Sequence, residues 1–460
     1  MQKNSRTMVR DLTEGSVTKL LLSFAMPLFV SNALQALYNL VDMVVVGQVV
    51  GGAGMSAVSI GGDILHILTF LAMGFSAAGQ VIIAQHVGAG RMDEVRKLIG
   101  TMFSFLLAAS VVMSAVCYIL REPMLNVLNT PAESRASTMD YTVTCILGLP
   151  FIYGYNIVSA ILRGMGDSKR PFLFVAIAAV INTALDLWFV AGLRMGAFGA
   201  ALATVIGQAV SFAISIVYLY IRRESFGFDF RLKSFAVDRA SLKSLVSLGV
   251  PMAIQSAAIN ISKIVLTAWI NSAGLVYSAL NGIYAKVGMM AGVVSNSFTT
   301  AGSSMVGQCL GAGKFDRVPK VMRTVLLIGL ALTVPASAVV LLWNRPIFSL
   351  FTSDAAVLAE AAILIVPTVI NLFGCCTRSV AFSIINGSGN SKMNLAVALI
   401  DGMISRIGIA ALLGFACNMG CKGFWYGDSL AGFMPITLGM IFYLSGRWRT
   451  GDMLKKHLEK

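Results

Sequence analysis

Long apolar runs separated by short polar stretches make up most of the chain. Twelve runs are long enough to cross a hydrocarbon layer of about 30 Å as α-helices. They lie at residues 20–47, 57–87, 98–120, 138–162, 171–193, 197–221, 245–271, 275–308, 321–343, 356–384, 393–416 and 423–445. This pattern predicts an all-α membrane protein with twelve transmembrane helices.

The longest polar connection, residues 222–244, divides the runs into two sets of six. We therefore expect an N-terminal lobe of six helices over residues 1–221 and a cytoplasmic inter-lobe loop over 222–244. A C-terminal lobe should occupy residues 245–460, with six more helices and a basic C-terminal tail.

Short motifs recur in the two halves at an offset of 223–224 residues. The matching segments are MPLFVSNAL (26–34) with VPMAIQSAA (250–258), AQHVGAGRMDEV (84–95) with GQCLGAGKFDRV (307–318), RGMGDSK (163–169) with NGSGNSK (386–392), and MGAFGAA (195–201) with MGCKGFW (419–425). Six spans per half is an even number, so both lobes should have the same orientation, related by a pseudo-two-fold axis along the membrane normal. Pro27 and Pro251 are equivalent and should kink the first helix of each half, because proline removes a backbone hydrogen bond.

Composition and charge support a membrane protein and orient it. Only 12% of the residues are charged and the mean hydropathy is +0.80, whereas soluble domains carry about 25% charged residues. The net charge of +14 does not indicate nucleic-acid binding, because the basic residues lie in short loops between apolar runs. Most of them lie on the side that holds both termini, and the opposite side has only Arg121, Arg135, Arg194, Arg345 and Lys422. The positive-inside rule then places both termini in the cytoplasm.

The sequence offers little for enzyme chemistry. The seven cysteines are scattered through apolar segments and match neither a zinc site nor a disulfide framework. No GxxxxGK[ST] motif occurs, and none of the three histidines lies near a plausible nucleophile and acid. We therefore expect a protein that is not an enzyme and needs no cofactor.

Two carboxylates stand inside the apolar runs of the first half. Asp42 and Asp186 lie at similar depths below the outer ends of spans 20–47 and 171–193, and Asn182 precedes Asp186 by one turn. Thr204 lies at a depth comparable to that of the two carboxylates, on the next span. Acidic residues within a bilayer are usually functional. Two neighbouring carboxylates cannot both stay charged cheaply, which favours an exchangeable proton, but the same oxygens could hold Na⁺ at Asp42, Asn182 and Asp186.

Further polar residues within the spans are candidates for a substrate cavity. In the first half, Gln35 and Asn39 lie on one stripe with Asp42, and Asn156 lies deeper in the fourth span. The second half has a different character, with Asn260 and the basic residues Lys263, Lys286, Arg378 and Arg406 in its spans. These cations either neutralise Asp401 and Asp428 or form a basic wall that attracts an anionic group of a substrate.

The chain resembles the multidrug and toxic compound extrusion (MATE) family. The resemblance rests on MPLFVSNALQALYNLVDMVVVGQ in the first span, the QHVGAG and QCLGAG stretches, RGMGDSKRP after the fourth span and VINTALDLWF in the fifth. Asp42 in YNLVD, with Asn182 and Asp186 four residues apart, is similar to the DinF-like prokaryotic branch.

This resemblance implies two six-helix lobes that export organic compounds, typically amphipathic cations, in exchange for H⁺ or Na⁺ by alternating access. In that branch the coupling residues lie in the first lobe, which assigns the role to Asp42, Asn182 and Asp186, with Thr204 beside them. It also implies the inner membrane of a prokaryote, small-molecule substrates, no nucleic acid and function as a monomer. Flippases of lipid-linked oligosaccharides share the wider superfamily, and the basic second lobe fits that alternative.

Overall fold

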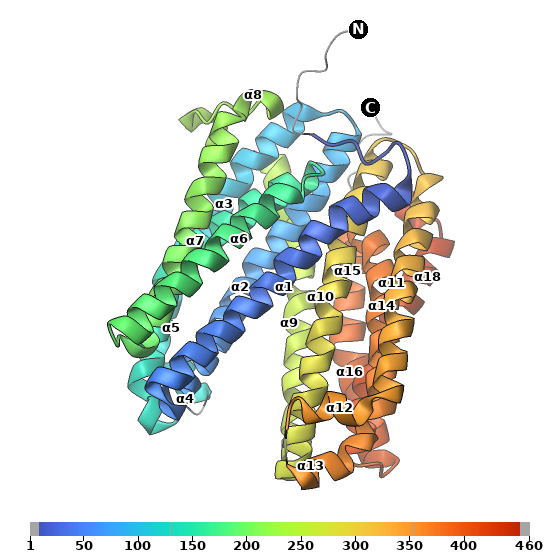
Figure 1. Ribbon diagram of the computed structural model, residues 1–460. Coiled ribbons are helices and arrows are strands. Elements are labelled where there is room, and N and C mark those ends of the chain that lie inside the picture. The colour runs from blue at the N-terminus through green and yellow to red at the C-terminus, as the bar shows by residue number, and fades with distance from the viewer. Residues whose placement is uncertain (1–8, 129, 353, 451–460) are drawn as a thin grey trace. The chain divides into compact units, whose positions relative to one another are not determined.

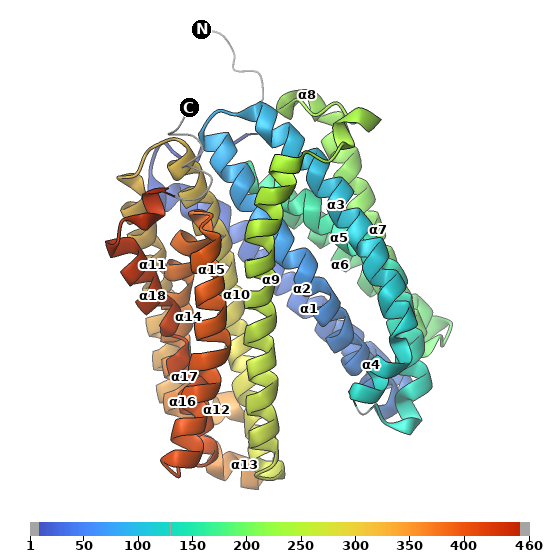
Figure 2. The ribbon, with the colours of Figure 1, turned by 180° about the vertical axis from the view of Figure 1, so that it is seen from behind.

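The computed structural model describes residues 9–128, 130–352 and 354–450, and these residues form helices, turns and loops without a β-strand (Figures 1 and 2). The predicted basic C-terminal tail beyond Thr450 lies outside the described residues. The chain divides into two compact units. Among the described residues, unit 1 contains residues 9–11 and 26–249, and unit 2 contains residues 12–25 and 250–450.

The helices of the first half follow the predicted order. They are α1 (Val17–Val50), α2 (Gly52–Gly88), α3 (Met92–Ile119), the short α4 (Arg121–Val127), α5 (Ala132–Gly164), α6 (Lys169–Asp186) with the π-helical turn η1 (Leu187–Gly192), and α7 (Gly196–Ile221). Helix α5 packs against α2, α3 and α7, so it forms the centre of unit 1.

The second half repeats this order with more interruptions. Its long helices are α9 (Arg239–Asn271), α10 (Leu275–Gly311) and α11 (Arg317–Leu342), followed by the short α12 (Asn344–Ser349) and by α13 (Ala355–Glu360), η3 (Ala361–Leu364) and α14 (Ile365–Gly387). The last two spans are α15 (Ser391–Leu399), η4 (Ile400–Ser405), α16 (Arg406–Ala411) and η5 (Leu412–Ala416), then α17 (Cys421–Ala431) and α18 (Met434–Leu444), with η6 (Arg447–Thr450) at the end. Helix α14 packs against α10, α11, α17 and α18 and forms the centre of unit 2.

The twelve predicted spans are all present as helical segments. Among the described residues, eleven helices are long and apolar enough to cross a membrane. The remaining predicted span is α10, which is 37 residues long but carries a more polar sequence that includes Asn281 and Lys286. The predicted last span is divided into α17 and α18, because Pro435 opens a new helix just after Gly432 and Phe433.

The sequence repeat is also a repeat of packing. A Cβ on Gly164 would lie 2.8 Å from the carbonyl oxygen of Gln80, and a Cβ on Gly387 would lie 2.9 Å from the carbonyl oxygen of Ser303. The two glycines are equivalent in the repeat, and so are their neighbours. Glycine at both places lets the central helix of each unit approach the second helix of that unit closely.

Two helices pass from one unit to the other, and each contains a proline predicted to be a kink. Residues 12–25 belong to unit 2, and the remainder of α1 from Met26 belongs to unit 1. Likewise α9 lies in unit 1 up to Gly249 and in unit 2 from Val250. Pro27 and Pro251 therefore lie within two residues of these boundaries, inside continuous helices. Each proline leaves a backbone carbonyl without its helical partner at the place where the chain changes unit.

The predicted inter-lobe loop is folded onto unit 1. It contains α8 (Arg223–Phe226) and η2 (Leu232–Phe235). Phe228 and Phe235 make an edge-to-face contact with ring centroids 5.3 Å apart, and Phe235 contacts Phe103 of α3 at 5.8 Å. The backbone N–H of Asp238 donates to the Thr101 hydroxyl at 3.0 Å. These contacts hold the connection against α3.

Candidate cation site and ion-pair network

Asp42 and Asp186 lie together inside unit 1, and we call them the acidic pair. Asp42 is contributed by the second half of α1, and Asp186 is the last residue of α6, immediately before the π-helical turn η1. Their exposed fractions are 4% and 0%. The side chains lie within hydrogen-bonding distance of each other. A π-helical turn offsets the chain by one residue and is often found at functional sites.

Asn182 and Thr204 complete the surroundings of Asp42. With the Asn182 amide oriented to satisfy its neighbours, Nδ2 donates to Asp42 Oδ1 at 3.0 Å and Oδ1 accepts from the backbone N–H of Thr204 at 3.3 Å. The Thr204 side chain also lies within hydrogen-bonding distance of the Asp42 carboxyl. Asp42 is therefore held by two neutral polar side chains.

Asp186 has no such support. Within the described residues, neither of its carboxyl oxygens accepts a hydrogen bond from a donor group. A hydrogen bond between Asp186 and Asp42 requires a proton on one of them, because two ionised carboxylates are both acceptors. A buried carboxylate without a donor is costly, so this arrangement calls for one shared proton or one bound cation. The oxygens of Asp42, Asp186, Asn182 and Thr204 are of the kind that hard cations prefer.

Two residues beside this site were not singled out from the sequence. A small cavity in unit 1 is lined by Tyr38, Asn182, Thr204 and Gln208, with Ala178 and Gly207. The Tyr38 hydroxyl lies within hydrogen-bonding distance of the Gln208 side chain. A helical signal was available, since Tyr38 lies one turn before Asp42 and Gln208 one turn after Thr204.

Among the described residues, the other predicted residues of the first half make no hydrogen bond to the acidic pair. Asn156 donates to the backbone carbonyl of Ile152 at 2.8 Å, within its own helix. Asn39 is exposed and Gln35 is half-buried on α1. These three remain candidates for a substrate surface only.

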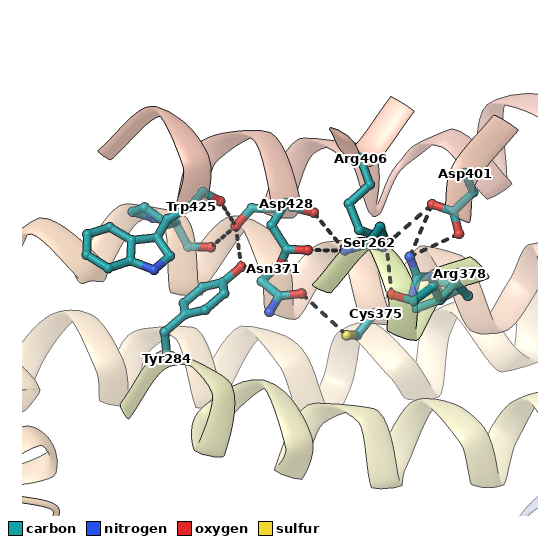
Figure 3. A network of polar contacts seen from close by, with 12 residues as sticks. Ser262, Tyr284, Asn371, Cys375, Arg378, Asp401, Arg406, Trp425 and Asp428 are labelled. Atoms are coloured by element: carbon teal, nitrogen blue, oxygen red, sulfur yellow. Dashed lines mark hydrogen bonds and ion pairs between the residues drawn. The ribbon is translucent and has the colours of Figure 1, made fainter. Parts of the chain in front are cut away.

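Unit 2 contains a network of opposite charges, which we call the C-terminal network: Tyr284, Arg378, Asp401, Arg406 and Asp428 (Figure 3). Arg406 forms ion pairs with Asp428 and, at 3.6 Å, with Asp401. Arg378 Nη2 contacts Asp401 at 3.2 Å, and the Tyr284 hydroxyl donates to Asp428 Oδ2 at 2.8 Å. Asp401 lies in the π-helical turn η4, and this turn ends at Ser405, directly before Arg406.

The remaining basic residues predicted for a cavity are not in ion pairs. Lys263 and Lys286 are exposed on α9 and α10, and neither has an acidic side chain within 4.0 Å in the part of the chain that the structure describes. Asn260 donates to the carbonyl of Ser256 at 2.8 Å. The prediction that the four cations neutralise acids therefore applies to Arg378 and Arg406.

Comparison with known proteins identifies the family. The MatE family model matches the chain twice, at residues 27–188 and 251–412. This chain belongs to the MATE family. The two matches correspond to the two halves of the repeat, and the family consists of membrane transporters rather than enzymes.

Relatives and solved structures agree with that assignment over nearly the whole chain. A protein named "Probable multidrug resistance protein YpnP" from Bacillus subtilis (strain 168) is 27% identical, covering 95% of this chain and 97% of its own length. A "Probable multidrug resistance protein NorM" from Thermotoga maritima is 24% identical over 96% of both.

Solved structures show the same fold. A crystal structure of a MATE protein in complex with MaD3S has a TM-score of 0.86 at 22% identity, covering 99% of this chain and 100% of that one. A transporter from Pyrococcus furiosus, whose title describes "reverse polarity of binding pocket", has a TM-score of 0.83 at 21% identity, covering 97% of this chain and 98% of that one. The fold of this MATE protein is therefore the two-lobe transporter fold of its relatives.

Proposed function

We propose that this MATE protein is a secondary antiporter that exports amphipathic organic compounds, in exchange for an inward-moving cation that binds at the acidic pair. The observation that carries the proposal is the burial of Asp42 against Asp186, whose oxygens lack a donor among the described residues. A site of this kind is stable only when a proton or cation is bound. Its occupancy can therefore couple an ion gradient to a change of conformation.

Each residue has a distinct role in this proposal. Asp42 and Asp186 bind the coupling ion, which is H⁺ or Na⁺. Asn182 and Thr204 orient Asp42 through hydrogen bonds, so that loss of the ion leaves one carboxylate held in place. Pro27 and Pro251 are the points where α1 and α9 bend as the transporter alternates between inward-facing and outward-facing states.

We also propose that the protein works as a monomer in the inner membrane of a prokaryote, with both termini in the cytoplasm. The charge distribution of the loops supports this orientation, because Lys and Arg are concentrated on the side of the termini. Labelling of single cysteines introduced at positions 233 and 422, with a reagent that does not cross membranes, tests it. Position 422 should react in intact cells and position 233 only after permeabilisation.

Transport from reconstituted vesicles tests the coupling. Proteoliposomes would be loaded with ethidium and a panel of amphipathic dyes, and a pH gradient and a Na⁺ gradient would be imposed separately. We expect one gradient to drive dye movement by the unmodified protein, and neither to drive it in Asp42→Asn or Asp186→Asn. Asp140→Asn is the matched control, because Asp140 is an exposed carboxylate on α5 of the same unit.

The result that would overturn the proposal is full gradient-driven transport by both Asn variants at the site. Dye binding to the purified variants separates loss of coupling from loss of folding. The alternative function, a flippase of lipid-linked oligosaccharides, depends on free cations in the second half. Ion pairs with Asp401 and Asp428 engage two of the four basic residues, Arg378 and Arg406, and this reduces the support that free cations give to that alternative.

A further inference from the structure

The C-terminal network carries more positive than negative charge once Lys263 is included. Asp401 is in contact with Arg378 and Arg406, and Asp428 is in contact with Arg406 and Tyr284. Both acids are therefore already compensated inside unit 2. Lys263 adds one more positive charge, and no acidic side chain lies within 4.0 Å of its ammonium in the described part of the unit.

Lys263 faces this network. Its ammonium interacts electrostatically with Asp428, Arg406 and Arg378, which lie on three other segments of unit 2. The side chain is nevertheless exposed, so it lies at the accessible edge of the network. A ligand can therefore reach it without breaking a pair that is already formed.

Lys263 lies on a polar stripe of α9, next to the exposed side chains of Ile261 and Ile264. Ser256, Asn260, Lys263 and Thr267 follow one another at spacings of four, three and four residues, which places them on one stripe of the helix. Thr267 accepts a hydrogen bond from Asn281 of α10 at 3.2 Å. A polar stripe of this length within a membrane helix faces protein or a water-filled surface rather than lipid.

Arg378 provides a second donor next to Lys263. Its Nη2 is used by Asp401 and its buried Nε has no acceptor among the described residues, while 17% of the side chain is exposed, so a ligand can reach the guanidinium from that exposed part. An unused guanidinium N–H and an unpaired ammonium together suit a carboxylate, which accepts hydrogen bonds at both of its oxygens.

We propose that Lys263 and Arg378 form a binding site for the carboxylate of an exported compound, with Asn260 and Thr267 on α9 as the polar surface beside it. The proposal rests on the proposed transport function and specifies the class of substrate. An excess of positive charge repels a second cation, so this unit recognises the substrate, whereas the acidic pair of unit 1 binds the coupling ion.

Equilibrium binding of two matched probes tests the assignment without any transport. The probes are 1-pyrenebutyrate and 1-pyrenebutylammonium, which share a ring system and differ in charge. Energy transfer from the protein's tryptophans to pyrene would be measured in phosphatidylcholine liposomes. We expect Lys263→Met to weaken pyrenebutyrate binding about tenfold or more while leaving pyrenebutylammonium unchanged, because a desolvated charge-assisted contact is lost. Lys263→Glu should reverse the preference between the two probes.

Lys422→Met is the matched control, since Lys422 is an exposed lysine at the start of α17 in the same unit. Equal pyrenebutyrate affinity in the unmodified protein and in Lys263→Met would overturn the proposal. Loss of pyrenebutyrate binding on addition of phosphatidylglycerol would assign the site to a lipid phosphate and would also overturn it. Pyrenebutyrate binding is measured without an ion gradient and coupling is measured with one, so a failure of ion coupling and a failure of this site give different results.

Discussion

In unit 2, Arg406 forms an ion pair with Asp428, and Asp428 occupies the repeat position that is equivalent to Thr204 of unit 1. The motifs at 195–201 and 419–425 fix this correspondence. In unit 1 the hydroxyl of Thr204 supports Asp42, and neither member of the acidic pair has a basic partner among the described residues. In unit 2 a fixed guanidinium neutralises the acid. Unit 1 thus has a buried acidic pair that we propose as the site of the coupling ion, whereas its copy has an ion pair at the equivalent position.

The same substitution should therefore have opposite effects in the two units. Asp186→Asn replaces one of two facing carboxylates with an amide that can donate to Asp42. An unsatisfied buried group costs about 1–3 kcal/mol, and Asp186→Asn removes one. We therefore expect this variant to have a free energy of unfolding equal to or higher than that of the unmodified protein. Asp428→Asn should lower it, because Arg406 loses a charged partner. Thermal unfolding of both variants in detergent measures the difference, and destabilisation of equal size would contradict it.

Removal of Arg406 should show strong coupling with Asp428. Arg406→Met leaves Asp428 buried without a basic partner, which should lower the free energy of unfolding by about 3–5 kcal/mol. Adding Asp428→Asn removes that uncompensated charge, while Asp401 keeps its contact with Arg378. We expect the double variant to be more stable than Arg406→Met alone. Simple addition of the two single effects would argue against a coupled network.

Glycine at the equivalent positions 164 and 387 should be required in both units. An added Cβ would lie less than 3.0 Å from a backbone carbonyl oxygen in each case. We expect Gly164→Ala and Gly387→Ala each to lower stability by about 1–3 kcal/mol through overpacking. Gly62→Ala on α2 is the control, because a Cβ there meets nothing within 4 Å. A neutral result at both 164 and 387 would mean that the helices separate at little cost.

Asp238 should stabilise the start of α9 in a manner that depends on pH. Its Oδ2 accepts from the Ser241 backbone N–H at 2.7 Å, and this contact with Ser241 holds the pKa of Asp238 below its usual range. The stabilisation is therefore present above the unfolded pKa of about 3.9 and is lost as the pH falls through the lower folded value.

Asp238→Ala should accordingly lower the free energy of unfolding by about 0.5–2 kcal/mol at pH 7, the usual effect of losing an N-cap. The gap between variant and unmodified protein should narrow below about pH 4. Unfolding measured from pH 7 to pH 3 checks both points. A gap that stays constant with pH would show that the charge of Asp238 contributes nothing.

The sequence by itself determined the spans, the repeat and the family. Apolar runs of membrane length have one satisfactory conformation in lipid, since every backbone group must be paired within the segment. This is why the predicted spans agree with helices such as Val17–Val50 and Gly196–Ile221 to within a few residues. The helical period and the distance of each residue from the end of its span also placed Asp42, Asn182, Asp186 and Thr204 at a similar depth in the membrane. The structure brings these four residues together.

Only the tertiary structure decided which polar groups are partners. From the sequence alone, the cations of the second half could either neutralise Asp401 and Asp428 or form a basic wall. In the structure, the closest contacts of Arg378 and Arg406 join residues of different helical segments. The packing of α9 against its neighbours likewise leaves Lys263 at the edge of this network rather than in an ion pair. Helical period fixes depth and direction within one segment, whereas the choice among partners depends on how separate helices pack.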